Sequence, residues 1–362
     1  MFPSAALSWR THLAQTIMHG YEVRFMTHAH VITGSFGAGK TTAIRRLMSR
    51  KPVAELWVVI LNEFTEAGLD ALSVAQSAHG AYDVRVVAGG CLCCASELEF
   101  GKQVRDILRR LEPVRLLIEP SGAGHAADIV DELATYEAQR ALTLDSVVCL
   151  VDALDSPRIV RHRDTNEWAQ IQCADVLLMS KPDLAGPAEL NAFEEIAAAQ
   201  YPLKRHVGVC EHGELPAAAL QPYARTPGFS LVRDAGEAAM AQTVPFALHG
   251  RNGSESRECH LGLWAVSWLL PRDLTFSRVV IEPRLTWMIE ACHGALRRFK
   301  GVFRTGPGPS WLVQSHGRGL AGEASAYRRD SRIEIVLAAP PSEAFLDDWR
   351  SMLRDAALEP RM

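Results

Sequence analysis

Residues 34–41 read Gly34-Ser35-Phe36-Gly37-Ala38-Gly39-Lys40-Thr41, which fits the pattern Gly-x-x-x-x-Gly-Lys-Ser/Thr of a phosphate-binding loop. An apolar run at 28–33 predicts a strand before the loop, and the stripe Ile44, Leu47 and Met48 predicts a helix after it. In that context glycines let consecutive backbone N–H groups converge on phosphate oxygens at the helix N-terminus. A chance glycine turn is the alternative, and the complete order of strand, loop, Lys-Thr and helix disfavours it. The chain is therefore predicted to be a P-loop nucleotide hydrolase.

Several residues of this loop are expected to contact the nucleotide, namely Gly34, Gly37, Gly39, Lys40, Thr41 and Thr42. Lys40 would reach the β- and γ-phosphates and act in catalysis, and the Thr41 hydroxyl would ligate Mg²⁺. A second acid, Glu119, follows the predicted strand 114–118. It would hold Mg²⁺ directly or through water and take part in catalysis, while the Gly122 amide would sense the γ-phosphate. Taken alone, Glu119 could also be a solvated acid after a strand, and its pairing with the phosphate loop disfavours that alternative.

The base pocket is predicted at Ser180-Lys181-Pro182-Asp183, which follows the apolar run 175–179. A carboxylate at Asp183 can accept both N1–H and the exocyclic amine of guanine, and Lys181 would lie along the ribose and the loop. The same residues also suit an ordinary turn in which Asp183 caps a helix. On these residues alone both readings stay open.

The fold class follows from the alternation of strands with helical patterns. Apolar runs, nearly continuous in Val, Ile and Leu, predict strands at 28–33, 55–61, 84–88, 114–118, 146–151 and 175–179. Strands alternating with helices indicate an α/β domain over 26–210, with a mostly parallel sheet covered on both faces.

The rest of the chain is predicted to hold a linker and a smaller domain, because 362 residues exceed one ordinary core. Residues 211–258 are rich in Pro and Gly and lack periodicity, which indicates a linker or irregular structure. Residues 259–362 suggest a small α+β domain. Its expected elements are a strand at 261–269, a helix at 284–299, strands at 310–314 and 332–338, and a terminal helix. Residues 1–25 make a poor signal peptide and are expected to be disordered or to precede the true start.

Composition restricts the partners and the compartment. The formal net charge is −4 without a basic block, which argues against a nucleic-acid or membrane-surface partner. No apolar run approaches the length of a membrane span. Without an export signal we expect a cytoplasmic protein with reduced thiols, either a monomer or a homodimer.

Three of the eight cysteines crowd together as Cys91, Cys93 and Cys94, after the glycine pair 89–90. Three thiolates within four residues make a compact soft site that suits Zn²⁺, with an open fourth position for loading and release. The alternatives are a redox pair and inert buried thiols. The remaining cysteines are predicted to be small core residues, namely Cys149, Cys173, Cys210, Cys259 and Cys292.

These motifs together resemble those of the CobW-type metallochaperone GTPases, whose members handle cobalamin synthesis, nitrile hydratase activation and zinc. The matching blocks are Gly34–Thr42, Asn62–Asp70, Gly90–Cys94 and Glu119–His125, with a weaker match at Ser180–Asp183 and a second-domain signature at Arg298–Thr305. The resemblance implies GTP hydrolysis with Mg²⁺, coupled to delivery of a metal, most often Zn²⁺, to a client metalloenzyme.

The resemblance also makes Asn62–Asp70 a first switch region, in which Glu63 would be catalytic and Glu66 a candidate zinc ligand. The chain departs from the family pattern at Thr65, Ser180 and Ala126, where Gly, Asn and Pro are usual, and it has no histidine-rich tract. Two other functions stay open. One is a P-loop ATPase or kinase with redox-active cysteines, and the other is a metal-sensing regulatory GTP-binding protein.

Overall fold

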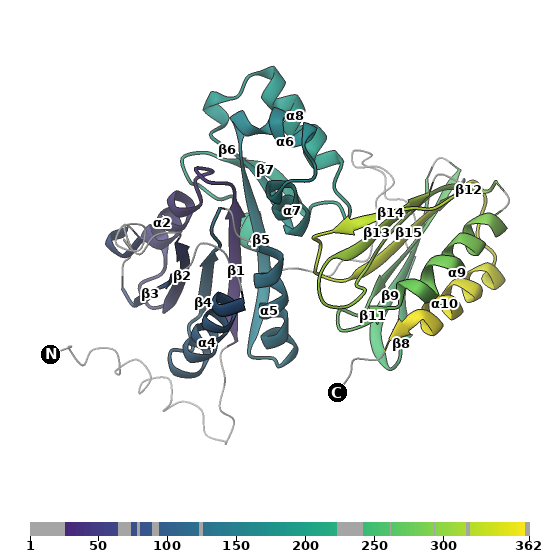
Figure 1. The fold of residues 1–362 in the computed structure, drawn as a ribbon, viewed down its shortest axis with the longest axis horizontal. Helices are drawn as coiled ribbons and strands as arrows, with labels where there is room; N and C mark the ends of the chain where they lie inside the picture. Colours follow the sequence, from purple (N-terminus) through teal and green to yellow (C-terminus); the bar gives the residue numbers. More distant parts are fainter. Residues whose placement is uncertain are drawn as a thin grey trace.

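The computed structural model describes residues 26–63, 74–77, 80–88, 94–122, 126–222, 242–260, 262–292, 294–315 and 319–358. Two seven-stranded sheets, each with its own helices, lie side by side (Figure 1). The first sheet comes from the N-terminal part of the chain and the second from the C-terminal part.

The first sheet is parallel throughout, in the order β3-β2-β4-β1-β5-β6-β7. Its strands are β1 (Thr27–Gly34), β2 (Trp57–Glu63), β3 (Tyr82–Ala88), β4 (Arg115–Glu119), β5 (Leu142–Asp152), β6 (Val176–Ser180) and β7 (His206–Cys210). The predicted parallel α/β fold is confirmed, and β7 is a strand that the apolar pattern did not indicate.

Helices cover both faces of this sheet, which explains the nearly continuous apolar strands. Val58 and Ile60 of β2 join one buried cluster, while Val59 and Leu61 join the other. The helices are α2 (Lys40–Arg50), α4 (Cys94–Arg110), α5 (Ala126–Ala138), α6 (Ser156–Arg161), α7 (Asn166–Cys173) and α8 (Pro187–Ala198).

The second sheet is antiparallel, in the order β14-β13-β12-β15-β10-β9-β8. Its strands are β8 (Gln242–Leu248), β9 (Arg251–His260), β10 (Leu263–Leu270), β12 (Leu296–Phe303), β13 (Ser310–Ser315), β14 (Ala321–Ser325) and β15 (Ser331–Leu337). A short pair, β11 (Thr275–Phe276) with β16 (Ala357–Leu358), stands beside it. The predicted second α+β unit is confirmed in its class.

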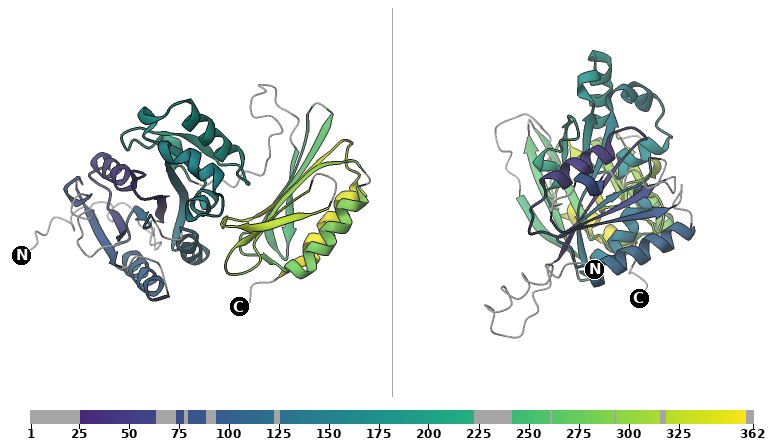
Figure 2. Two further views of the ribbon diagram at one scale, coloured as in Figure 1. Left: turned by 45° about the horizontal axis from the view of Figure 1, so that its top comes forward. Right: turned by 90° about the vertical axis from the view of Figure 1, so that its left-hand side faces the viewer.

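Two helices, α9 (Arg278–Ala291) and α10 (Glu343–Ala356), pack on one face of the second sheet (Figure 2). Trp268 of β10 stacks on Trp349 of α10 with ring centroids 5.7 Å apart, and both side chains are fully buried. This aromatic pair lies in a core separate from those of the first sheet.

The expectation of irregular structure over 211–258 is wrong for 242–258, which form β8 and most of β9. Pro245 is tolerated because β8 is an edge strand, where a missing N–H breaks no ladder bond. Gly253 fits because a side chain there would press on the Leu269 carbonyl, 2.6 Å from its Cβ. Pro245 and Gly253, which contributed to the linker prediction, are thus positions in the two outermost strands of this side of the sheet.

The predicted helix 284–299 is also wrong in its second half, because α9 ends at Ala291 and β12 begins at Leu296. Gly294, with φ at +83°, turns the chain between them. Met288 and Phe299 face the same core from a helix and from a strand. The spacing of these two residues therefore matched that of a continuous helix, although they lie on two different elements.

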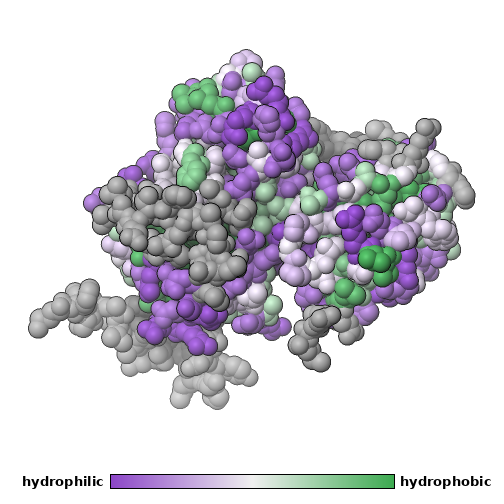
Figure 3. Space-filling view, in the orientation of Figure 1, coloured by the Kyte–Doolittle hydropathy of each residue, from purple (hydrophilic) through white to green (hydrophobic). Residues whose placement is uncertain are grey.

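The face of the molecule seen in Figure 3 is mainly hydrophilic, with hydrophobic side chains in small separate groups. Exposed large hydrophobic side chains on α9 include Val279 and Trp287. Within the described part of the chain, no helix is long and apolar enough to cross a membrane.

Candidate nucleotide and metal site

The candidate site lies at the carboxyl edge of the parallel sheet. Strands β1, β4, β5 and β6 end there at Gly34, Glu119, Asp152 and Ser180. The pairing registers Gly34↔Leu150 and Asp152↔Ser180 show that these ends lie at one edge. In open α/β sheets this edge is where ligands bind, since the loops that follow the strands converge there.

The glycines of the loop are required by backbone conformation and by close packing. Gly37 and Gly39 have φ values of +77° and +89°, which L side chains rarely adopt. Gly39 is the N-cap of α2, so the loop delivers its amides to the positive end of that helix. A Cβ at Gly34 would lie 2.3 Å from the Leu150 carbonyl oxygen. This geometry fits a bound phosphate group.

Lys40 is 6% exposed, and its ammonium group donates hydrogen bonds to the Gly34 and Ser35 carbonyls, each at 2.9 Å. The loop thereby surrounds the positively charged ammonium group of Lys40. A positive charge at this position favours binding of phosphate. Thr42 is exposed, and its carbonyl packs against Gly213, whose Cβ would lie 2.9 Å away.

Thr41 and Glu119 come together although they are far apart in the sequence. The Thr41 hydroxyl donates to Glu119 Oε1 at 2.9 Å, and Glu119 is 8% exposed. A hydroxyl and a carboxylate are oxygen donors of the kind that Mg²⁺ prefers, so the pair fits that ion. Gly122 is also buried against the loop, because its Cβ would lie 2.6 Å from the Phe36 amide nitrogen.

The residues predicted to bind the base, Ser180–Asp183, do not converge on one point, and each has a different partner or exposure. Lys181 has φ at +53°, and its ammonium donates to Asp152 Oδ2 at 2.5 Å. The Ser180 hydroxyl is buried and donates to the Val151 carbonyl at 3.3 Å. Asp183 is exposed, in the 3₁₀ turn Pro182–Leu184.

Sequence reasoning missed two residues at this edge. Asp152, the partner of Lys181, ends β5, and the argument that found Glu119 at the end of β4 could have found it as well. Gln170 of α7 is 1% exposed and donates through Nε2 to the Gly122 carbonyl at 3.0 Å. No local motif marks Gln170, because its partner lies on another element.

The predicted zinc residues fall largely outside the described residues. Cys91, Cys93 and Glu66 lie outside them, and Cys94 and Glu63 are described only in their backbone, as the first residue of α4 and the last of β2. Ala88, the last described residue before the cysteine segment, pairs with Glu63, and Leu61 of the same strand pairs with Glu119. Among the residues that are described, no three His, Cys, Asp or Glu side chains gather in a metal-binding group.

The other cysteines mostly behave as predicted. Cys149, Cys173, Cys210 and Cys292 are buried, and Cys259 is half-buried. Burial raises the pKa of the Cys149 and Cys173 thiols to about 12, which keeps them protonated near neutral pH. These two cysteines are therefore core residues and not metal-binding thiolates.

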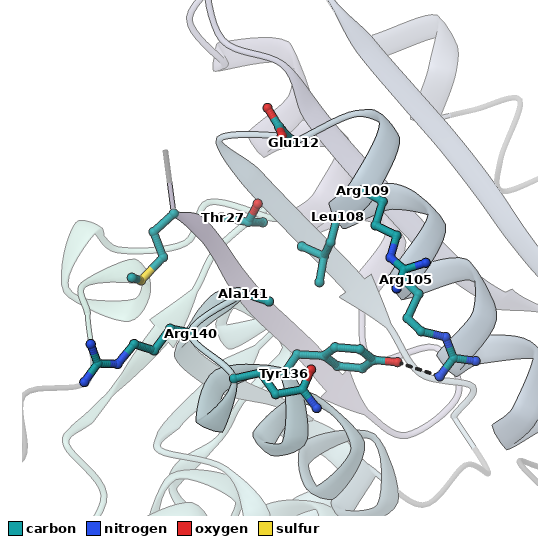
Figure 4. A pocket seen from close by; sticks show the side chains of 10 residues that line it. Thr27, Arg105, Leu108, Arg109, Glu112, Tyr136, Arg140 and Ala141 are labelled. Carbon is teal, nitrogen blue, oxygen red and sulfur yellow. Dashed lines mark hydrogen bonds between the residues drawn. The ribbon is translucent and has the colours of Figure 1, made fainter. Parts of the chain in front are cut away.

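A pocket of about 270 Å³ lies away from this edge (Figure 4). It is lined by Thr27, Arg105, Leu108 and Tyr136, where Arg105 donates to the Tyr136 hydroxyl at 3.4 Å. Thr27 begins β1 and Gly34 ends it, so the pocket and the nucleotide loop lie at opposite ends of one strand.

Fold and loop define the chain as a P-loop nucleotide hydrolase with an antiparallel second domain. Residues 28–207 match the family described as CobW/HypB/UreG, nucleotide-binding domain. The chain is 30% identical to the zinc chaperone YeiR of Escherichia coli (strain K12) over 351 residues. That alignment covers 93% of this chain and 99% of YeiR. The chain belongs to the CobW/HypB/UreG family, and it is a GTPase that uses GTP with Mg²⁺.

A second relative is the zinc chaperone YjiA of the same organism, 32% identical over 166 residues, or 44% of this chain and 50% of that protein. Among solved structures, that of the Zn(II)-bound YjiA GTPase from E. coli aligns with a TM-score of 0.41 and 18% identity, over 90% of this chain and 99% of that chain.

Proposed function

We propose that the chain is a zinc metallochaperone, which binds Zn²⁺ at Cys91, Cys93 and Cys94 and hands it to a client metalloenzyme during a cycle of GTP hydrolysis. The observation that carries the proposal is the neighbourhood of β2, β3 and β4. The register brings Glu63, Ala88 and Glu119 into adjacent strands at the edge that holds the phosphate loop. The relatives YeiR and YjiA, named as zinc chaperones, support the choice of metal.

In the proposed hydrolysis, Lys40 and the loop amides of Gly34, Gly37 and Gly39 bind the phosphates, beside Thr42. Thr41 and Glu119 would hold Mg²⁺, which when bound would supply positive charge beside the γ-phosphate oxygens. Glu63 orients water, and the Gly122 amide contacts the γ-phosphate. Because no covalent step involves the protein, catalysis rests on positioning and on electrostatic stabilisation.

Guanine is proposed to be read by Asp183, while Lys181 lies along the ribose. The Lys181–Asp152 ion pair supports this role, because it anchors the turn in which Asp183 is exposed. A preference for GTP over ATP distinguishes this function from an ATPase or a kinase, and incubation with small-molecule acceptors would reveal a kinase.

Zinc is proposed as cargo, held by three thiolates with Glu66 as a candidate further ligand. Thiolates are soft ligands that select Zn²⁺ over Mg²⁺, so the two metal sites do not compete. Loading in a reducing compartment suits this chemistry, and we propose the cytoplasm as the place where the client receives the metal.

The test is a linkage measurement. If GTP changes the affinity for zinc by some factor, zinc must change the affinity for GTP by the same factor. We expect zinc affinity to differ between the complexes with GDP and with a non-hydrolysable GTP analogue. Equal affinities would contradict coupled delivery.

Variants separate the two halves of this function. Lys40→Ala should abolish hydrolysis, whereas Cys93→Ala should lower zinc binding and leave basal hydrolysis largely intact. Cys259→Ala, which removes a half-buried cysteine of the second domain, should change neither. If Cys93→Ala unfolds the protein, the cysteine segment is structural and the proposal is wrong.

A further inference from the structure

We propose that Gln170 is a positioning residue for GTP hydrolysis, and that α7 transmits the position of the segment Glu119–Gly122 to the C-terminal domain through Gln172. The inference rests on GTP hydrolysis and does not depend on zinc delivery. Three links carry it: from α7 to Gly122, from Gly122 to the phosphate loop, and from α7 to the second sheet.

The first link is the hydrogen bond from Gln170 Nε2 to the Gly122 carbonyl, at 3.0 Å. Gln170 is 1% exposed and stands beside the buried Ile171. A buried amide group that lacks a hydrogen bond destabilises the folded protein. The side chain of Gln170 therefore favours the position of the Gly122 carbonyl in which the hydrogen bond forms. Gln170 therefore holds the Gly122 carbonyl at a defined distance from α7.

The second link joins Gly122 to the nucleotide loop. A Cβ at Gly122 would lie 2.6 Å from the Phe36 amide nitrogen and 2.8 Å from its ring, so the two backbones are in direct contact. Glu119, three residues earlier, accepts the hydrogen bond from the Thr41 hydroxyl. A shift of Gly122 relative to α7 therefore reaches both the phosphate loop and the Thr41–Glu119 pair.

The third link runs from α7 to the C-terminal domain. Gln172 Oε1 accepts a hydrogen bond from the Ala326 amide, directly after β14, at 3.2 Å. Residues two apart on a helix point to nearly opposite sides. Gln170 thus faces the nucleotide segment, while Gln172 faces the second domain.

The end of α7 is fixed, so the helix can act as a unit. The buried ammonium of Lys204 donates to the carbonyls of Ile171, Gln172 and Ala174. Directly after them Asp175 receives hydrogen bonds from Arg329 of the C-terminal domain, and both side chains are fully buried. The end of α7 is therefore tied to the C-terminal domain by contacts that are expensive to break.

A cavity of about 450 Å³ lies next to this joint. Its lining includes Ala126 at the start of α5, Gln172 of α7, and Ser325 and Arg328 of the second domain. Arg328 also donates to Asp131 of α5 at 2.9 Å. Both helices that border the nucleotide segment thus contact the C-terminal domain.

The test of positioning uses Gln170→Met, which keeps the volume and removes the donor. We expect kcat for GTP to fall about fivefold to tenfold, as the loss of one buried hydrogen bond implies, with KM changed less than twofold. Gln172→Met, which leaves the Gly122 contact intact, should keep kcat within twofold of the parent. A normal kcat in Gln170→Met overturns the positioning role, and so does an equal loss from both variants.

Gln170→Glu supplies a readout that a purely structural role would not move. A carboxylate cannot donate to the Gly122 carbonyl, whereas a protonated carboxyl can, and burial raises the pKa of a carboxyl group. We expect this variant to be slow at pH 8 and to recover activity relative to the parent towards pH 6. A pH profile parallel to that of the parent contradicts the proposal.

Transmission is tested by hydrogen–deuterium exchange of the full chain, with GDP and with a non-hydrolysable GTP analogue. In the parent we expect the protection of the Ala326 amide to differ between the two nucleotides. In Gln170→Met that difference should disappear although both nucleotides still bind. If the parent shows no difference, or if Gln170→Met retains it, α7 does not transmit the signal.

Discussion

The Thr41 hydroxyl and Glu119 Oε1, which lie 2.9 Å apart, are the two oxygen donors that we propose for Mg²⁺. Replacing the acid by its amide keeps the acceptor for the hydroxyl and removes the negative charge. We expect Glu119→Gln to fold normally and to lower kcat for GTP by about 10²- to 10³-fold, with partial recovery at high Mg²⁺. Steady-state hydrolysis over a magnesium titration measures this.

The matched control is Glu211→Gln, which alters an exposed acid that lies 3.9 Å from Nε2 of its neighbour His212. Its magnesium dependence should equal that of the parent. An unchanged magnesium dependence in Glu119→Gln would show that this carboxylate does not serve the metal.

The protonation of one residue, His30, is expected to make the stability of the protein depend on pH. Burial, reinforced by the Arg115 charge, lowers the pKa of His30 to about 3. Arg115 can only donate, so His30 Nε2 accepts its hydrogen bond and Nδ1–H donates to the Ser146 hydroxyl, at 2.8 and 2.9 Å. The native protein thus holds a neutral imidazole in a fixed tautomer.

The sign of the effect follows from proton binding. Between pH 3 and 6.5 the unfolded chain binds a proton at His30 that the native protein does not, so the free energy of unfolding rises with pH in that window. The stabilisation is present above pH 6.5 and is lost as the pH falls. In His30→Gln we expect the slope below pH 6 to be shallower by up to about 1.4 kcal/mol per pH unit, measured by urea unfolding. Equal slopes in parent and variant would contradict a neutral buried His30.

At the scale of the element, the turn after β4 is shaped by its contact with the phosphate loop. A methyl group at Gly122 would meet the Phe36 backbone at 2.6 Å, so the turn or the loop must move. We expect Gly122→Ala to weaken binding of GTP at least tenfold, at a stability cost of about 1–3 kcal/mol. Calorimetric titration with GDP and the GTP analogue checks the first quantity.

Gly250 offers the comparison, because it turns the β8–β9 hairpin with φ at +73° and has open space at its Cβ position. Gly250→Ala should cost about 1 kcal/mol in backbone strain and leave nucleotide binding unchanged. Similar binding losses in both glycine variants would show that general destabilisation, and not contact with the loop, causes the effect.

At the scale of the whole molecule, the Arg329–Asp175 pair joins the two domains. Arg329 also donates to the Leu144 carbonyl at 2.9 Å, and Asp175 accepts from the Val147 amide, so both charges are satisfied in the interior. Arg329→Met leaves the Asp175 carboxylate buried without its cation. We expect a loss of about 3–5 kcal/mol in the free energy of unfolding, measured by urea denaturation.

Adding Asp175→Asn should restore much of that loss, because the amide oxygen can still accept from Val147 and no charge remains. A double variant that is less stable than Arg329→Met, or a single variant that loses under 1 kcal/mol, would argue against a buried interdomain ion pair.

Prediction from the sequence succeeded where the signal lay within one element. The runs at 28–33 and 114–118 correspond to β1 and β4, because strands that are covered on both faces are rich in apolar residues, even though β1 also buries His30 and Thr33. It failed at 242–258 and 296–299, because a sheet edge tolerates Pro and Gly and because one core receives side chains from a helix and from a strand. Both features depend on which elements lie next to each other in the fold, and the local sequence does not show that.

The phosphate loop is a local object, and eight consecutive residues carry its glycines, its lysine and its threonine, so inspection of the chain alone located it. The contacts around this loop and between the two domains join residues far apart in the chain. Thr41 and Glu119 are separated by 78 positions, Gln170 and Gly122 by 48, and Arg329 and Asp175 by 154. Such pairs leave no periodicity or spacing in the sequence, since their proximity arises only when parallel strands align their carboxyl ends and the second domain docks against α5 and α7.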